Sequence, residues 1–352
     1  MKNAFIFAII LFLIGGAFFC GALIANGGFR FDKKLTTKTI TVDEDFTSVF
    51  SEIHTTDIKL LPSQDGKCTV ILHEKDTFSH AVEAKNNTLC ITAPTERSWL
   101  EFLFGFQNPM LEIYLPKAEY NSLDIDCSTG NIYVSDAFTF GIAEIEVSTG
   151  DIEFFASATG AVSLEATTGD ISANGIRAES IEISTTTGDV VIKNATINGA
   201  ASLEVGTGKI EADTILAKEI EIEGGSGKKT LKNLTIEGAA CIESTTGGIA
   251  ITDMRSDTLS IHLSTGDSLL KNCLVATDLR IQATTGDVIL DASDAGEIDI
   301  KTNTGSITGT ILSGKIFDAK STSGKVITPQ NDLSGGVCKL ATTSGRIEFK
   351  IQ

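Results

Sequence analysis

The segment Leu123–Val134, with the sequence LDIDCSTGNIYV, is one copy of a motif that recurs through most of the chain. Apolar and polar residues alternate in it, a Ser/Thr-Thr-Gly turn follows, and the alternation then resumes. The motif glycine returns every 19 to 21 residues, at Gly130, Gly150, Gly169, Gly188, Gly208, Gly227, Gly247, Gly266, Gly286, Gly305, Gly324 and Gly345. A fixed period of this size is typical of a solenoid, in which each repeat forms one coil.

Each repeat predicts short strands joined by polar corners. Apolar residues lie seven and five positions before the glycine and two and four positions after it, as Leu123, Ile125, Ile132 and Val134 do in the first copy. This period of two gives a strand one apolar face. Glycine accepts the positive φ of the intervening turn without steric cost. Many repeats add a third short apolar pair after a corner Asn or Asp, at Asn194, Asn233, Asn272 and Asp253.

We therefore predict an all-β fold, a parallel β-solenoid of about 12 coils in which each strand pairs with its copies above and below. At ~4.8 Å per coil, the rod would be roughly 55–60 Å long. An isolated coil buries too little apolar surface to offset the conformational entropy that it loses on folding. Coils must therefore pack against and hydrogen-bond to their neighbours to be stable. Lys229 and Ser268 interrupt an inward apolar column, and we expect their coils to be the least stable.

The acidic composition of the chain disfavours some classes of binding partner. The chain has 352 residues and a formal net charge of -18. Nucleic-acid binding needs a Lys/Arg surface that displaces counterions, so we expect no nucleic-acid partner. Simple electrostatic adhesion to anionic lipid is disfavoured for the same reason. An acidic surface also keeps a protein soluble, which is its more common role.

The seven cysteines form no CxxC pair, so no zinc or redox motif is present. Cys127, Cys273 and Cys338 occupy inward positions, where they would act as small core residues. Cys68 and Cys90 are expected in neighbouring strands, and whether they form a disulfide stays open at this point.

Residues 1–35 predict a membrane anchor. Residues 4–25 are almost wholly apolar, and twenty-two helical residues span a hydrocarbon layer of ~30 Å. A cleaved signal peptide is the alternative. Lys2 precedes the segment, whereas Arg30, Lys33 and Lys34 follow it, so the charges do not decide the orientation. We expect a single-pass protein of the cell membrane with its solenoid outside the cytoplasm.

Residues 36–120 lack the glycine period and predict an irregular β cap that leads into the solenoid of residues 121–352. We expect strands at residues 40–42, 57–60, 68–72, 89–92 and 111–115. The cap also holds a cluster of large apolar residues that would form an interaction patch or pack over the solenoid: Trp99, Leu100, Phe102, Leu103, Phe104 and Phe106.

Few residues of the sequence are arranged to bind a metal ion or to catalyse a reaction. Aspartate follows the motif glycine at Asp151, Asp170, Asp189, Asp267 and Asp287, and stacked carboxylates ~5 Å apart could share Ca²⁺. Exposed turn residues explain the same pattern, and basic residues break the column at Lys209, Lys228, Lys325 and Arg346. No catalytic or nucleotide-binding motif occurs, and the coils leave no long loop for a pocket. We predict no catalytic residue, no metal and no cofactor.

The apolar N-terminal segment, the lead-in Ile113-Tyr114-Leu115-Pro116 and the serial Ser-Thr-Gly-Asp-Ile turns resemble the "putative adhesin" β-strand-repeat family of bacteria. This is a family of unknown function (DUF4097-like), and the resemblance covers roughly residues 36–352. It implies a β-solenoid that is often membrane-associated and linked to the cell envelope, and it implies no catalytic residues.

Together these observations predict a non-enzymatic, membrane-anchored solenoid that acts at the cell envelope as an adhesin-like binding or scaffolding surface. Its partners would be the membrane, through residues 4–25, and envelope proteins or polysaccharide. A cytoplasmic, membrane-tethered polymer similar to bactofilins is the first alternative. A polysaccharide-acting β-helix enzyme is a weaker one.

Overall fold

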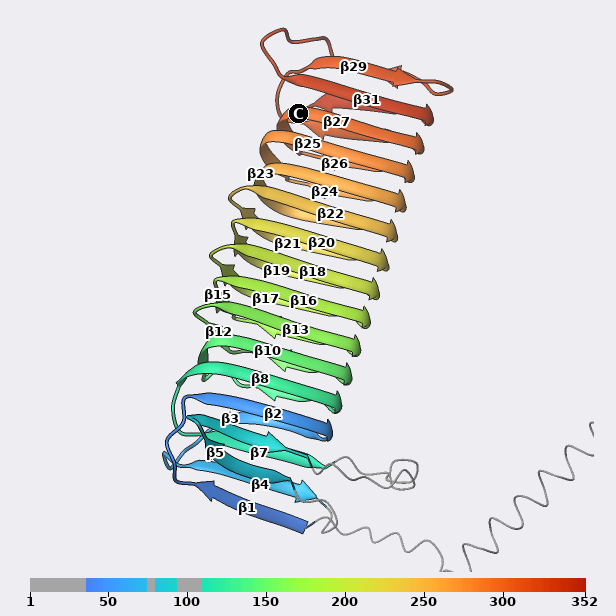
Figure 1. Cartoon of the computed structure of the whole chain (residues 1–352). Coiled ribbons are helices and arrows are strands. Elements are labelled where there is room, and N and C mark those ends of the chain that lie inside the picture. Colours follow the sequence, from blue (N-terminus) through green and yellow to red (C-terminus); the bar gives the residue numbers. More distant parts are fainter. Residues whose placement is uncertain (1–35, 75–79, 94–108) are drawn as a thin grey trace, which may run out of the picture. The chain divides into compact units, whose positions relative to one another are not determined.

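The computed structural model describes residues 36–74, 80–93 and 109–352, and over these residues the fold is all-β. The chain divides into two compact units, Met1–Thr36 and Thr37–Gln352, and the second unit is the solenoid (Figure 1). The described residues contain no helix long and apolar enough to cross a membrane. The anchor predicted at residues 4–25 lies outside them, as does the apolar patch from Trp99 to Phe106.

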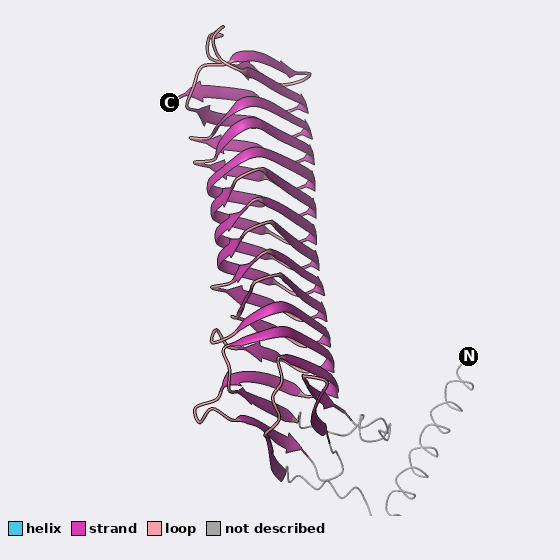
Figure 2. Cartoon of the chain, turned by 60° about the vertical axis from the view of Figure 1, so that its left-hand side comes forward, coloured by secondary structure: helices cyan, strands magenta, loops and turns pink. Residues whose placement is uncertain are grey.

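Two sheets face each other along the solenoid (Figure 2). The strands that lead into the glycine turns form the first, which we call the long-strand sheet: β2 (Ser48–Thr55), β8 (Glu119–Thr129), β10 (Thr139–Thr149), β13 (Ala161–Thr168), β16 (Ser180–Thr187), β18 (Ala200–Thr207), β20 (Glu219–Ser226), β22 (Ala239–Thr246), the second half of β23 (Ile249–Thr265), β25 (Leu274–Thr285), β27 (Asp294–Thr304) and β31 (Val337–Ser344).

The strands that leave the turns form the second, the return sheet: β3 (Asp57–Pro62), β9 (Ile132–Val134), β11 (Ile152–Phe154), β14 (Ile171–Asn174), β17 (Val190–Ile197), β19 (Ile210–Ala217), β21 (Lys229–Ile236), the first half of β23, β24 (Ser268–Lys271), β26 (Val288–Asp291), β28 (Ile307–Ile311) and β32 (Ile347–Ile351). Two short strands, β12 (Ser157–Ala158) and β15 (Arg177–Ala178), lie on the third side of their coils.

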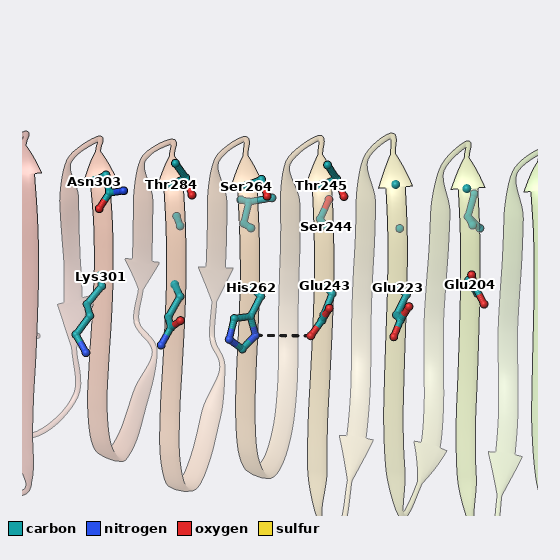
Figure 3. A pocket seen from close by; sticks show the side chains of 17 residues that line it. Glu204, Glu223, Glu243, Ser244, Thr245, His262, Ser264, Thr284, Lys301 and Asn303 are labelled. Atoms are coloured by element: carbon teal, nitrogen blue, oxygen red, sulfur yellow. Dashed lines mark ion pairs between the residues drawn. The ribbon is translucent and has the colours of Figure 1, made fainter.

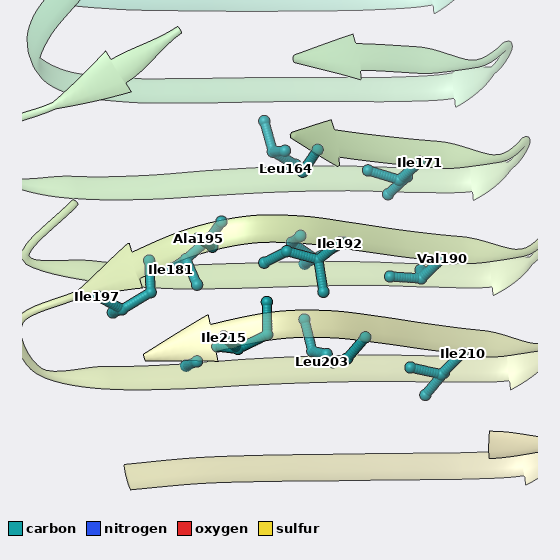
Figure 4. Close-up of a cluster of buried hydrophobic side chains, with 14 of the residues drawn as sticks. Leu164, Ile171, Ile181, Val190, Ile192, Ala195, Ile197, Leu203, Ile210 and Ile215 are labelled. Carbon is teal, nitrogen blue, oxygen red and sulfur yellow. The ribbon is translucent and has the colours of Figure 1, made fainter. Parts of the chain in front are cut away.

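Equivalent positions of successive coils lie in register, which confirms the predicted solenoid. Ile145 pairs with Ile125 on one side and with Leu164 on the other, in parallel strands. Ile152 pairs in the same way with Ile132 and with residue 171. The inward residues therefore form continuous apolar columns that fill the space between the sheets (Figure 4).

The turn glycines are required by close backbone packing. Gly150 has a φ of 145°, in the region that favours glycine. A Cβ at this position would overlap the carbonyl oxygen of Gly130 in the coil below. The same overlap recurs from coil to coil, so the 19- to 21-residue period reflects a backbone contact that no other residue type accepts.

The opposite corner uses asparagine, as the sequence predicts. Asn194 and Asn233 have φ values of 52° and 54°. The Asn194 amide donates to Asn174 Oδ1 of the preceding coil at 2.9 Å, and Asn233 donates to Asp213 Oδ1 at 2.8 Å. These side chains therefore support the left-handed corner and also link neighbouring coils.

All five strands predicted in residues 36–120 are confirmed, in β1 (Thr36–Val42), β3, β4 (Cys68–Glu74), β6 (Thr88–Thr92) and β7 (Met110–Leu115). The parallel stack extends into this region, because β2 pairs with β8 and β6, and β3 pairs with β9 and β7. Irregularity begins with β4, antiparallel to β7, and with β5 (Ala81–Lys85), antiparallel to β6.

The six cysteines of the described residues do not form disulfides. Cys68 lies in β4 and Cys90 in β6, and these strands are not neighbours, so the expected adjacency is wrong and both thiols are free. Strand β4 joins the return sheet through its antiparallel pairing with β7, whereas β6 joins the long-strand sheet through its parallel pairing with β2. Cys127, Cys273 and Cys338 are buried, as predicted, and burial raises the pKa of each thiol.

The coils at the C-terminal end do not stack in chain order. β31 pairs with β27 on one side and with β29 (Ile316–Ser321) on the other. β32 lies likewise between β28 and β30 (Val326–Ile327). The last coil of the sequence is thus inserted beneath the coil that precedes it, and residues 328–336 carry the chain back. Strand β29 therefore lies at the end of the long-strand sheet (Figure 1).

Candidate binding groove on the long-strand sheet

A groove of about 700 Å³ lies on the outer face of the long-strand sheet. It crosses β18, β20, β22, β23, β25 and β27, and therefore extends roughly 24 Å along the solenoid axis at the usual strand spacing. It is a shallow, open depression across the strands, and it is lined at two equivalent outward positions of each coil (Figure 3).

Two rows of outward side chains border the groove. The charged row, four positions before each motif glycine, consists of Glu204, Glu223, Glu243, His262, Gln282 and Lys301. The small row, two positions before the glycine, consists of Gly206, Gly225, Thr245, Ser264, Thr284 and Asn303. Both rows point to the same face because side chains two apart on a strand do so. The hollow exists because the small row carries short side chains or none.

The charge of the first row changes sign along the groove. Burial and the neighbouring carboxylates of Glu221, Glu204 and Glu243 raise the pKa of Glu223. His262 Nδ1 lies 4.0 Å from Glu243 Oε1 (Figure 3). At the far end, Lys301 Nζ lies 3.3 Å from Asp299 Oδ2.

The interior behind the groove holds a buried lysine. Lys229 is fully buried in β21, and its Nζ donates to Gly224 O at 3.2 Å, Gly227 O at 3.0 Å and Ser244 Oγ at 2.7 Å. Burial lowers its pKa to about 8. A Cβ at Gly224 would overlap Lys229 Cε and Nζ, so the glycine provides the space that the lysine occupies.

The turn aspartates bind backbone rather than one another. Asp151 Oδ1 accepts from Asp170 N at 2.8 Å, Asp170 Oδ1 accepts from Asp189 N at 2.7 Å, and Asp189 Oδ1 accepts from Lys209 N at 2.8 Å. Asp267 and Asp287 continue the same pattern higher in the stack. Within the described ranges, no group of three or more His, Cys, Asp or Glu residues is placed to hold a metal ion.

With the coil geometry established, the family follows from a match to the Toastrack DUF4097 model over residues 47–228 and 242–352. The chain belongs to the Toastrack DUF4097 family. No curated protein matches the chain.

The chain is also similar to solved structures of low sequence identity. A "putative adhesin" of Parabacteroides distasonis is 12% identical, with a TM-score of 0.37, and the match covers 90% of this chain and 98% of that one. A "putative lipid binding protein" of the same species is 12% identical, with a TM-score of 0.31 and coverage of 91% and 98%. A "putative cell adhesion protein" of Clostridium sporogenes is 12% identical, with a TM-score of 0.23 and coverage of 91% and 100%.

The sequence pattern located the structural residues of this Toastrack DUF4097 chain but not its groove. The motif glycines, except Gly324, adopt the positive φ expected of them. The proposed apolar patch falls in the connection between β6 and β7, outside the described residues. The sequence did give one signal for the groove, because Gly206 and Gly225 stand where other coils carry Ser or Thr and so leave two strands of the row without a side chain.

Proposed function

We propose that this protein is a non-enzymatic binding surface displayed at the cell envelope, and that its groove holds an elongated polymer laid along the solenoid axis. The groove itself carries the proposal. It presents a polar side chain at the same position of each of six successive strands, which suits an elongated ligand that contacts all of them.

A neutral or amine-bearing polysaccharide fits the groove best. The hydroxyl and amide groups of Thr245, Ser264, Thr284 and Asn303 can both donate and accept hydrogen bonds. The Glu204, Glu223 and Glu243 carboxylates accept from sugar hydroxyls and attract ammonium groups. The net charge of -18 repels polyanions, which excludes acidic polysaccharides and nucleic acids as ready ligands.

Binding without catalysis is favoured by the openness of the site. Glycoside hydrolysis needs two carboxyl groups with separated pKa values, on either side of a sugar ring held away from water. Here the glutamates lie side by side on one exposed sheet face, and no long loop in the described part of the chain covers them. The match to the Toastrack family assigns no catalytic role to any residue of the groove.

The proposal that the protein is displayed at the envelope is based on the apolar segment at residues 4–25. Protease accessibility of a C-terminal tag tests it in the native host. Cleavage in intact cells, or after removal of an outer wall alone, is the expected result. Protection until the cells are lysed would contradict display and favour the cytoplasmic, membrane-tethered alternative.

Ligand binding can be tested with chito-oligosaccharides and their N-deacetylated, amine-bearing counterparts. Ser264→Trp fills the centre of the groove from an exposed position and should weaken binding at least tenfold. Thr167→Trp is the matched control, because Thr167 occupies the same exposed row outside the groove. Equal effects of the two substitutions, or no binding of either glycan, would contradict the assignment.

A further inference from the structure

The end strand of the long-strand sheet, β29, has a free edge. Ile316 N donates to Gly336 O, directly before β31, and Thr322 N, directly after β29, donates to Thr342 O of β31. Since successive residues of a strand point their backbone groups to opposite sides, the N–H and C=O groups of Ala319 point away from β31. In the described part of the chain, no strand pairs with this side of β29.

Only the start of the free edge is covered. Asp332 N donates to Lys315 O at 3.0 Å, and Asn331 Oδ1 accepts from Phe317 N at 2.9 Å. The connection at residues 328–336 therefore shields the first part of β29 and leaves the segment around Ala319 open. An open edge of this kind can pair with a strand of another chain.

Apolar side chains also remain partly exposed at this end. Phe317 and Ala319 face inward and pack only partly against the core, with the Phe317 ring 6.4 Å from that of Phe349. In β30, Val326 is 39% exposed and Ile327 is 40% exposed. A further layer of strands would complete the burial of the three inward side chains, Phe317, Ala319 and Val326.

The charges along the edge specify which strand fits. Asp318 and Lys320 are exposed on either side of Ala319. If a second β29 approaches antiparallel with Ala319 opposite its own copy, each Asp318 faces Lys320 of the other strand. The two Ala319 residues also exchange a pair of N–H···O bonds. The segment is therefore complementary to itself.

We propose that two copies of this protein join end to end through their C-terminal coils, with β29 antiparallel to β29 of the second copy. The contact is a two-fold one that uses the same surface of both chains, so it closes as a dimer and does not propagate into a filament. The opposite end carries β4 and β5, whose antiparallel course does not repeat the coil pattern that a head-to-tail stack would extend.

A charge-swap series tests the proposal on the full-length chain in detergent. Asp318→Lys and Lys320→Asp each place like charges opposite one another at two points of the dimer. Cross-strand charge pairs are worth a few tenths to about 1 kcal/mol each, so either variant should weaken the dimer roughly tenfold, about 1.4 kcal/mol. The double variant Asp318→Lys/Lys320→Asp restores both pairs and should return the dimer Kd to within about threefold of the wild-type value.

Analytical ultracentrifugation over a range of concentrations measures the Kd, and residues 1–35 are the same in every variant. A wild-type chain that stays monomeric, or a double variant as weak as the single ones, would overturn the proposal. Association that none of the charge changes affects would also overturn it, and would assign self-association to another part of the chain.

An engineered disulfide tests the register. Opposed residues of a hydrogen-bonded antiparallel pair lie about 5.5 Å apart at Cα, within disulfide range. Ala319→Cys should therefore cross-link the dimer under mild oxidation much faster than the wild-type chain or a Thr186→Cys control on the exposed face of β16. A rate no higher than that of the control would refute the antiparallel register.

Discussion

Replacing Gly224 with valine and Lys229 with isoleucine together should make the middle of the solenoid more stable, although the valine alone should do the opposite. The preceding coil shows why, because it carries Val205 and Ile210 at the same two inward positions. In the lysine coil, the missing side chain of Gly224 leaves the space that the buried ammonium group occupies.

The pKa of Lys229 sets the size of the effect. Burial lowers it from the ordinary value of 10.5 to about 8. At about 1.36 kcal/mol per pKa unit, keeping the ammonium charged at neutral pH costs roughly 3 kcal/mol. The double variant Gly224→Val/Lys229→Ile removes this cost and refills the column, so its unfolding free energy should rise by about 3 kcal/mol. Replacing buried charges with well-packed apolar residues gives changes of this order.

The single variants should differ sharply. Gly224→Val alone inserts methyl groups where Lys229 Cε and Nζ lie, which displaces the ammonium group from its three acceptors. We expect a loss of about 3 kcal/mol or more. Lys229→Ile alone relieves the buried charge but leaves a void beside Gly224, so these two effects should nearly cancel.

Stability should also depend on pH in a specific direction. The folded pKa lies below the unfolded one, so between about pH 8 and 10.5 the unfolded chain binds more protons than the folded chain. The unfolding free energy contributed by this residue therefore increases as the pH rises through that window. The difference between the wild-type chain and the double variant should shrink from about 3 kcal/mol at pH 7 towards zero near pH 10.5.

Native-state hydrogen exchange of the β21 amides is the appropriate assay, because a solenoid need not unfold in one step and its coils differ in local stability. The reasoning fails if Gly224→Val has the same effect in the Lys229→Ile background as in the wild-type chain. It also fails if the stability difference is independent of pH.

Two further predictions concern the turns. Gly169→Ala should lower the unfolding free energy by several kcal/mol, since the added Cβ overlaps the carbonyl oxygen of Gly150; a change within 0.5 kcal/mol by chemical denaturation would be inconsistent with the close stacking. Asp170→Ala removes the acceptor for Asp189 N and should cost about 0.5–1.5 kcal/mol, whereas Asp170→Asn, which keeps an acceptor oxygen, should cost less. EDTA should leave the melting temperature unchanged; a fall of several degrees would restore the calcium hypothesis.

The sequence predicted the repeating part of the fold well because every coil meets the same physical conditions. Three features recur at fixed positions: a backbone approach that only glycine accepts, a corner that favours asparagine and an inward face that is mostly apolar. The stacking order at the C-terminal end could not be predicted in this way. A coil that carries the motif can pair with any other coil that carries it. The period therefore does not show whether β31 lies between β27 and β29, as it does, or beyond β29 at the end of the stack.

The interruptions in the pattern were visible, but their meaning required the structure. Lys229 was expected to loosen its coil, yet it donates to three acceptors, and the glycine that accommodates it lies five residues earlier in another strand. Ser268, the other interruption, is fully buried, and its Oγ has no hydrogen-bond partner among the described residues. The polar group of the interruption is therefore hydrogen-bonded in one coil and not in the other.

A uniform core leaves the outward positions free to vary, and this separates structure from function in a solenoid of this kind. The inward columns are mostly apolar, and an unsuitable residue in one of them affects the coils on both sides of it. The outward columns need not be apolar, so their residues can differ from coil to coil. The column that borders the groove changes from Glu204 through His262 to Lys301 over six strands. The stability of the solenoid does not require this order of charges. The order gives the groove an acidic end and a basic end, which a ligand with two different ends would recognise.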